Sequence, residues 1–181
     1  MTGKNDLIKF LLYRIEALKN NPESLQELSK FVTQDVNEYI SFTATGVCEE
    51  LNRASDLQLH LESANIGLPQ DFLDYILKEL LNNACRYSTK GTAIKLTGQK
   101  RVNGYQLTIQ DQGIGFSEGT TLEDIAPYIR LNEEKSKSDG LGLGLYNVKT
   151  LAAMFDAKIT LVSEPGLGSN ITILFRPVDV E

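Results

Sequence analysis

The spacing of apolar residues changes near Leu57, and this change constrains the fold more than any other feature of the 181-residue sequence. Before Leu57, apolar residues recur at intervals of three or four, which predicts amphipathic helices over residues 5–19 and 22–51. After Leu57, alternating segments typical of half-buried strands take over, interleaved with two further helical patterns. The chain therefore predicts an N-terminal helical hairpin over residues 1–56 and a mixed α/β domain over residues 57–181.

The second predicted helix has a clear start and a weak middle. Asn21 is a good N-cap, Pro22 suits the first helical position, and Glu23 places an acid in the first turn. Residues 41–46 are rich in β-branched residues and end in glycine, so a bend or break is expected there. The apolar stripe of this hairpin must be buried, either by packing on the rest of the chain or in the seam of a dimer. Residues 1–56 are interpreted as a dimerisation or partner-docking segment, and we expect a homodimer.

The elements predicted after Leu57 form an α+β fold, a two-layer sandwich in which helices cover one face of a largely antiparallel sheet. The strands are predicted over residues 57–61, 92–100, 105–110, 158–163 and 170–175, and the helices over residues 70–88 and 143–155. Asn103 and Gly104 lie between the second and third strands and are a strong hairpin signal.

The acidic balance of the chain limits its partners. The net charge is −6, which disfavours a nucleic-acid partner because phosphate backbones are bound by clustered Lys and Arg. No apolar run approaches the length of a membrane span, and the N-terminus lacks the pattern of a signal peptide. A cytoplasmic protein is therefore expected.

Cysteine and histidine offer no obvious reactive group. Cys48 and Cys85 have neither metal-ligand spacing nor an evident disulfide pairing, so each is interpreted as a small buried side chain of a helix. His60, the single histidine, falls on the polar face of the first predicted strand. We expect an exposed strand residue there, rather than a ligand or a catalyst.

The helix predicted over residues 70–88 has a chemically distinctive polar face. At about 100° per residue, Glu79, Asn82, Asn83 and Arg86 fall on one side. A carboxamide oxygen suits Mg²⁺, a guanidinium can reach a phosphate, and a carboxylate can orient or deprotonate a nucleophile. A solvated surface face would have the same polarity, so this helix alone does not assign a function.

Residues 111–115, with the sequence DQGIG, come directly after a predicted strand. Alternate glycines let the backbone approach a flat ligand closely, and a buried Asp111 can accept a hydrogen bond from the amino group of adenine. The alternative is a plain turn in which Asp111 accepts a hydrogen bond from its own backbone.

Residues 140–145, with the sequence GLGLGL, open the helix predicted over residues 143–155. A glycine-rich segment at a helix N-terminus offers N–H groups to a phosphate. The glycine spacing is not that of a dinucleotide-binding fingerprint, and no Lys-Ser or Lys-Thr pair follows as in a P-loop.

Together and in this order, the three segments resemble the GHKL (Bergerat) superfamily, which includes histidine kinases, type II topoisomerase ATPase subunits, heat-shock chaperones and mismatch-repair ATPases. The resemblance is strongest to histidine-kinase catalytic domains, and it covers residues 57–176. Residues 79–88 resemble the N box of that family, 111–115 the G1 box and 140–145 the G2 box. The terminal hairpin at residues 166–175 matches the closing segment of the family.

The resemblance implies a site for ATP and Mg²⁺. Asn83 would bind the magnesium ion, and Glu79 and Asn83 would serve catalysis. The residues implied for ATP binding are Asn82, Asn83, Arg86, Tyr87, Asp111, Gly113, Ile114, Gly115, Gly140, Leu141, Gly142, Leu143, Gly144, Leu145 and Ser169. Residues 117–139 would form the lid over the nucleotide. Because these positions all follow Leu68, a chain without residues 1–55 is expected to bind ATP as a monomer.

The chain departs from the histidine-kinase pattern in three places. Residues 1–56 contain no histidine, so self-phosphorylation on a conventional histidine is not expected. The F box is at best degenerate at residues 128–131. The helix after the G2 box ends in Asp156-Ala157, where relatives often have two glycines.

Three functions are compatible with this pattern. In the first, which we favour, the chain transfers the γ-phosphoryl group of ATP in trans to a response regulator or another phosphoacceptor protein of a two-component pathway. In the second, it is similar to the anti-sigma-factor serine kinases. In the third, it is a nucleotide-binding scaffold without catalysis. The topoisomerase, chaperone and mismatch-repair ATPases are disfavoured, because they need a second large domain.

Overall fold

The computed structural model describes residues 13–127, 143–176 and 178. Residues 13–19 are helical, and the helices that follow are α2 (Pro22–Leu28), α3 (Val36–Glu50), α4 (Gln70–Tyr87) and α5 (Gly144–Met154). The strands are β1 (Leu57–Leu61), β2 (Ile94–Arg101), β3 (Gly104–Gln110), β4 (Lys158–Glu164) and β5 (Gly168–Phe175), and short 3₁₀ turns form η1 (Ala54–Asp56) and η2 (Leu122–Asp124). Each helix and strand predicted after Leu57 is present within two residues of its predicted bounds.

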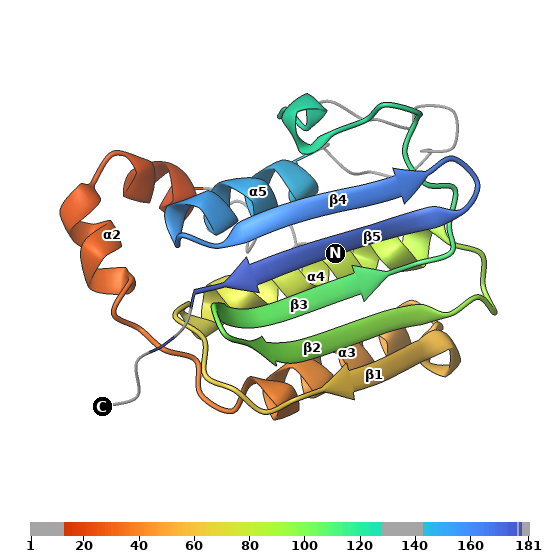
Figure 1. Cartoon of the computed structure of the whole chain (residues 1–181), viewed down its shortest axis with the longest axis horizontal. Coiled ribbons are helices and arrows are strands. Elements are labelled where there is room, and N and C mark those ends of the chain that lie inside the picture. The colour runs from red at the N-terminus through yellow and green to blue at the C-terminus, as the bar shows by residue number, and fades with distance from the viewer. Residues whose placement is uncertain (1–12, 128–142, 177, 179–181) are drawn as a thin grey trace.

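The five strands form one sheet in the order β1-β2-β3-β5-β4. β1 pairs parallel to β2, with Leu59 opposite Leu96, and the other neighbouring strands pair antiparallel. Figure 1 shows α3 and α4 together behind this sheet, whereas α2 lies at one end of the molecule. The predicted α+β sandwich with a helical N-terminal region is confirmed.

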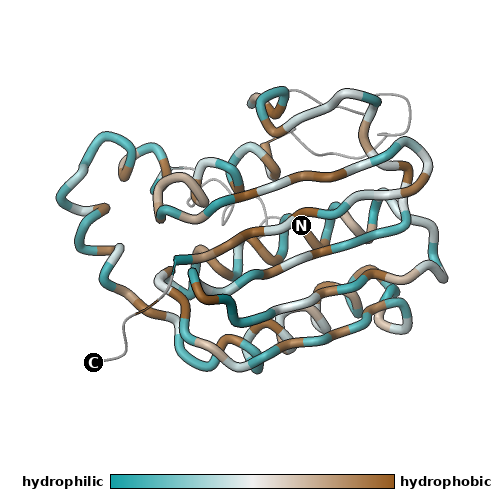
Figure 2. Tube along the Cα trace, viewed as in Figure 1, coloured by the Kyte–Doolittle hydropathy of each residue, from teal (hydrophilic) through white to brown (hydrophobic). Residues whose placement is uncertain are grey.

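Alternating side chains account for the way the sheet meets the helices. In β3, the side chains of Tyr105, Leu107 and Ile109 are buried between less buried neighbours. Figure 2 shows apolar stretches along the central strands and along the helices behind them. α4 has an apolar arc that is buried as a whole, and its members are Leu73, Ile76, Leu77, Leu80, Leu81 and Ala84.

Gly104 closes the predicted hairpin between β2 and β3. Its φ is +136°, and a methyl group at this position would collide with the carbonyl oxygen of Phe175 in β5. The position therefore requires glycine for both its conformation and its space.

The helix predicted over residues 22–51 is two helices, α2 and α3, and the break falls at residues 29–35 instead of the expected 41–46. Thr33 pairs with Ile66 through two backbone hydrogen bonds of 2.9 and 3.0 Å, and the Thr33 hydroxyl donates to the carbonyl of Leu68 at 2.6 Å. A partner far along the chain thus decides where the helix is interrupted, which a local pattern cannot show.

The apolar stripe of α3 is buried inside this chain. Val36, Ile40 and Ala44 are fully shielded from solvent, and α3 packs on α4 and β1. Burying a Val or Ile side chain contributes about 1.5–3 kcal/mol relative to leaving it exposed. The hydrophobic core therefore continues across residue 56, and this buried stripe cannot also form a dimer seam.

Candidate functional site

The polar face of α4 carries the residues predicted for magnesium and phosphate. Glu79, Asn82 and Asn83 are half-buried, whereas Arg86 in the last turn is exposed. The Asn82 amide donates to the carbonyl of Lys78 at 2.5 Å, while no hydrogen bond joins the Asn83 side chain to any residue that the structure describes. This hydrogen bond holds the Asn82 carboxamide by its nitrogen, whereas no described residue fixes the direction in which the Asn83 oxygen, the atom that a hard cation would bind, can turn.

Glu79 connects α4 to the start of α5. A methyl group at Gly144, the first residue of α5, would collide with Glu79 Oε2, so the carboxylate lies directly against this glycine. The first turn of a helix presents N–H groups that favour negative charge. The predicted N box therefore meets the last glycine of the predicted G2 box.

A buried polar pair that was not predicted lies one turn before Glu79. The side-chain amide of Asn147 in α5 donates to the hydroxyl of Tyr75 in α4 at 2.9 Å, and both residues are buried. Burial raises the pKa of the Tyr75 phenol, and the charge of Glu79 raises it further. The neutral phenol thus links α4 to α5. A tyrosine within the apolar arc of a helix was the available signal, because its hydroxyl needs a partner.

Asp111 is buried just after β3, and both of its carboxylate oxygens accept hydrogen bonds. Oδ1 accepts from the backbone N–H of Gly113 at 2.7 Å, and Oδ2 accepts from the hydroxyl of Ser169 in β5. The turn that stood as the alternative interpretation is therefore present. A carboxylate has about four acceptor sites, so this one can still accept from a further amine.

The two glycines of the loop after β3 let it pack between α4 and the β4–β5 turn. A methyl group at Gly113 would collide with the carbonyl of Tyr87, and one at Gly115, where φ is +66°, would collide with the carbonyl of Glu164. The N–H of Ile114 donates to the Tyr87 carbonyl at 3.0 Å. The loop and the last turn of α4, both predicted to contact the nucleotide, are therefore held together.

Arg53, which the sequence did not single out, holds the C-terminal end of α4. Its guanidinium donates to the carbonyls of Cys85 and Ser88 at 2.7 and 3.1 Å, and to two further carbonyls beyond the helix. A helix end leaves its last carbonyls without helical partners, and one buried side chain supplies donors to them here.

Asp56 completes this arrangement. It forms a buried ion pair with Arg53, and its Oδ2 accepts from the backbone N–H of Gly91 at 2.9 Å. The Gly91 N–H and then the Arg53 guanidinium hold the pKa of Asp56 below its usual value. The short segment between α3 and β1 therefore fixes the turn of α4 that carries the predicted site.

The predicted lid, residues 117–139, is described as far as residue 127. Thr121 begins η2 with a capping box, Ile125 is buried, and Nζ of Lys149 in α5 donates to the carbonyl of Leu122 at 2.7 Å. The first part of the predicted lid is thus attached to α5.

The glycine-rich segment is described only in part. Leu143 is the N-cap residue of α5 and Gly144 its first residue, as predicted, while Leu145 packs partly buried against the core. Gly140, Leu141, Gly142 and the degenerate F box at residues 128–131 lie outside the described residues.

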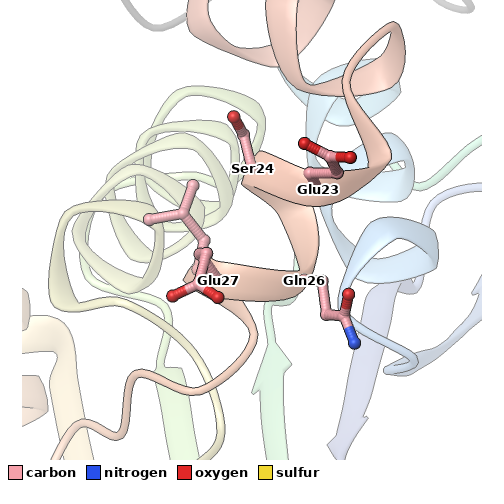
Figure 3. A pocket seen from close by; sticks show the side chains of 5 residues that line it. Glu23, Ser24, Gln26 and Glu27 are labelled. Carbon is pink, nitrogen blue, oxygen red and sulfur yellow. The ribbon is translucent and has the colours of Figure 1, made fainter.

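Other sequence predictions concern groups away from this site. His60 is exposed on β1, as expected. Within residues 13–127 and 143–176, no three His, Cys, Asp or Glu side chains gather as metal ligands, and no helix is both long and apolar enough to cross a bilayer. Figure 3 shows a hollow along α2. It is lined by Glu23, Ser24, Gln26, Glu27 and Leu28, and none of these is a predicted site residue.

The described site brings two chemical features together. Asp111 offers a buried acceptor beside the last turn of α4, Glu79 lies against the start of α5, and Asn83 follows Glu79 by one turn of α4. A ligand with an exocyclic amine at one end and a metal-bound polyphosphate at the other matches both.

The chain is similar to known ATPases and sensor kinases. The family model described as histidine kinase-, DNA gyrase B- and HSP90-like ATPase matches residues 69–179. The sensor histidine kinase YvrG of Bacillus subtilis is 33% identical over 115 residues, which are 64% of this chain and 20% of the relative. The adaptive-response sensory kinase SasA of Prochlorococcus marinus is 27% identical over 186 residues, covering 92% of this chain and 48% of the relative. This chain thus spans between a fifth and about half of these relatives.

Solved structures share the fold. The mycobacterial sensor histidine kinase MprB has a TM-score of 0.68 at 21% identity, over 82% of this chain and 100% of that one. Full-length ShkA in complex with AMPPNP has a TM-score of 0.65 at 17% identity, over 82% of this chain and 32% of that one. At such identities the likeness concerns the fold alone.

Proposed function

The chain belongs to the histidine kinase-, DNA gyrase B- and HSP90-like ATPase family, and we propose that it binds Mg-ATP and transfers the γ-phosphoryl group to a partner protein in trans. The buried carboxylate of Asp111, which Gly113 and Ser169 hold beside the last turn of α4, is the main support for ATP binding. Burying a carboxylate is costly unless hydrogen bonds satisfy it, and an amine of a ligand would add one more hydrogen bond to Asp111.

In this proposal, Asp111 accepts a hydrogen bond from the amino group of adenine. Gly113, Ile114 and Gly115 form the floor on which the base lies, and Tyr87 borders it. The tight fit of the two glycines against the carbonyls of Tyr87 and Glu164 supports this role, because any side chain there would disturb the loop.

Asn83 and Arg86 act on the phosphates. When bound, Mg²⁺ neutralises part of the triphosphate charge, and the carboxamide oxygen of Asn83 would be its protein ligand. The guanidinium of Arg86, one turn further along the same face, would approach the phosphates from solvent. Asn82, whose amide nitrogen donates to the Lys78 carbonyl, would contribute less than Asn83 to binding Mg²⁺ and the phosphates.

Glu79 is the proposed catalytic carboxylate. Its carboxylate lies against Gly144, at the N-terminal turn of α5. At this position, the Glu79 carboxylate would orient the nucleophile or accept its proton.

A response regulator is the proposed phosphoacceptor, because the similar proteins are sensor kinases and residues 1–56 contain no histidine. The cytoplasmic location and the homodimer through residues 1–56 stay predictions. The buried face of α3 is excluded as the dimer seam, so a dimer would have to use the remaining surface of that region.

Purified chain, labelled ATP and candidate response regulators test the proposal together. We expect label on the partner only when both proteins are present, and Glu79→Gln should still bind ATP but transfer roughly 100-fold more slowly. ATP binding without transfer to any partner would favour the nucleotide-binding scaffold. Acid-stable label on a partner serine would favour the anti-sigma-factor type of kinase, and label on His60 would contradict transfer in trans.

A further inference from the structure

Cys48 in α3 and Cys85 in α4 meet between the two packed helices, with their sulfur atoms 3.8 Å apart. Both are free thiols, and both side chains are buried. The sequence indicated only two separate buried thiols, and 37 positions separate them along the chain. The packing of α3 on α4 makes them a pair.

Arg53 fixes the backbone of both cysteines. Its own N–H donates to the carbonyl of Cys48 at 2.7 Å, and its guanidinium donates to the carbonyl of Cys85, also at 2.7 Å. One buried residue therefore sets the distance between the two helical turns that carry the thiols. Reacting groups held in this way have a high effective concentration toward each other.

The two thiols differ in their access to solvent. Cys85 is 7% exposed and Cys48 is fully shielded. Cys85 is therefore the sulfur that an oxidant meets first, and Cys48 is placed to react with its product.

We propose that Cys48 and Cys85 are a modification site, at which hydrogen peroxide forms a reversible intrachain disulfide. The Cys85 thiolate attacks a peroxide oxygen, the O–O bond breaks, and Cys85 becomes a sulfenic acid while hydroxide leaves and takes up a proton. The Cys48 thiol then attacks the Cys85 sulfur, the S–O bond breaks, and a second water leaves with the Cys48 proton. The thiols lose two electrons and the peroxide gains them; an external dithiol reverses the change.

The two sulfur atoms must move closer for the bond to form. A disulfide bond is about 2.05 Å long, so the sulfurs must approach by about 1.8 Å from their separation of 3.8 Å. Disulfides in reducing compartments are usually transient and redox-sensing, which fits a reduced resting state. The bond would lie in the turn of α4 that carries Asn83 and Arg86. Any effect of the bond on nucleotide binding rests on the proposed function, whereas the modification itself does not.

Intact-mass measurement of the full native chain after hydrogen peroxide treatment, without nucleotide, tests the proposal. We expect the mass of the chain to fall by about 2 Da and to return to its starting value when dithiothreitol is added. After proteolysis without dithiothreitol, the peptides that contain Cys48 and Cys85 should be found linked to each other, and with dithiothreitol they should be found separately. These measurements are made on the unsubstituted protein, so they do not depend on whether a variant folds. They also do not depend on ATP binding, so either proposal can fail alone.

Two matched variants test the order of events. Cys48→Ser should leave a Cys85 sulfenic acid that dimedone traps, whereas Cys85→Ser should yield no dimedone adduct at Cys48. A gain of oxygen at either cysteine without a linked peptide, a linkage found only between two chains, or an unchanged mass in the unsubstituted protein would each overturn the proposal.

Discussion

At the scale of single residues, Asp111 offers the sharpest test of the base pocket. Asp111→Asn should weaken ATP binding by roughly 10–100-fold, because hydrogen bonds to charged groups are worth about 1.5–3 kcal/mol. GTP presents no amino group at the same ring position, so its binding should change less. Calorimetry with both nucleotides measures the two losses, and equal losses would count against the assignment. Ser169→Ala removes only the hydroxyl that holds Asp111, so its affinity for ATP should lie between those of the unsubstituted protein and Asp111→Asn.

Asn83 and Asn82 form a matched pair for the metal site. Asn83→Ala should abolish the tightening of ATP binding by Mg²⁺, because it removes the proposed oxygen ligand. Asn82→Ala should keep that tightening, since the Asn82 amide is bound to the Lys78 carbonyl of its own helix. Nucleotide titrations with and without Mg²⁺ compare the two variants, and loss of the magnesium effect in Asn82→Ala alone would reverse the assignment.

Asp56 makes the stability of the protein depend on pH. Its folded pKa lies below the unfolded value, so its contribution is complete above the usual Asp pKa and is lost as pH falls through the folded pKa. The difference in unfolding free energy between the unsubstituted protein and Asp56→Asn should therefore be constant at neutral pH and shrink below about pH 3.9. Urea denaturation at a series of pH values measures it. A difference that stays constant into acid would remove Asp56 from this role.

At the scale of secondary-structure elements, α3 contains a glycine that its helix does not need. Gly46 lies inside α3, and a methyl group there would meet no atom within 4 Å. Gly46→Ala should therefore raise the unfolding free energy by about 0.5–1 kcal/mol, because alanine loses less backbone freedom on folding. Urea denaturation gives the value. Gly113→Ala is the contrasting control, since its methyl group would collide with the Tyr87 carbonyl and lower stability.

Elements whose signals are local could be predicted from the sequence, and those fixed by distant partners could not. Asn103-Gly104 marks the β2–β3 hairpin because the turn depends on two adjacent residues. The break before α3 was misplaced because Thr33 pairs with Ile66, which no local pattern reveals. Within the site, Asp111 follows from its motif, whereas Arg53 acts through carbonyls 32 to 39 positions away.

At the scale of the whole molecule, the continuous core changes the expected result of shortening the chain. Removing residues 1–55 takes away α3 and exposes the α4 surface that it covers, so we now expect loss of cooperative unfolding and of ATP binding. Removing residues 1–28 takes away α2, which has no buried residue, together with two buried side chains, Ile15 and Leu18. Because only these two leave the core, the shortened protein should be less stable but should still unfold cooperatively.

Circular dichroism and light scattering on both shortened chains check this expectation. A folded, ATP-binding protein without residues 1–55 would show that α3 is dispensable. Light scattering on the full chain also decides the predicted homodimer, since a monomer at every protein concentration would refute it.

The pairing of β3 with β5 has a consequence for how the protein is made. Thr108 and Thr172 contact each other across these strands although 64 positions separate them. A ribosome adds about 5–20 residues per second, so β3 waits roughly 3–13 s for its partner strand to be synthesised. During this time the edge of β3 is open and its apolar face is only partly covered. Burial of the nascent sheet therefore depends on β5, which is synthesised after the four other strands of the sheet.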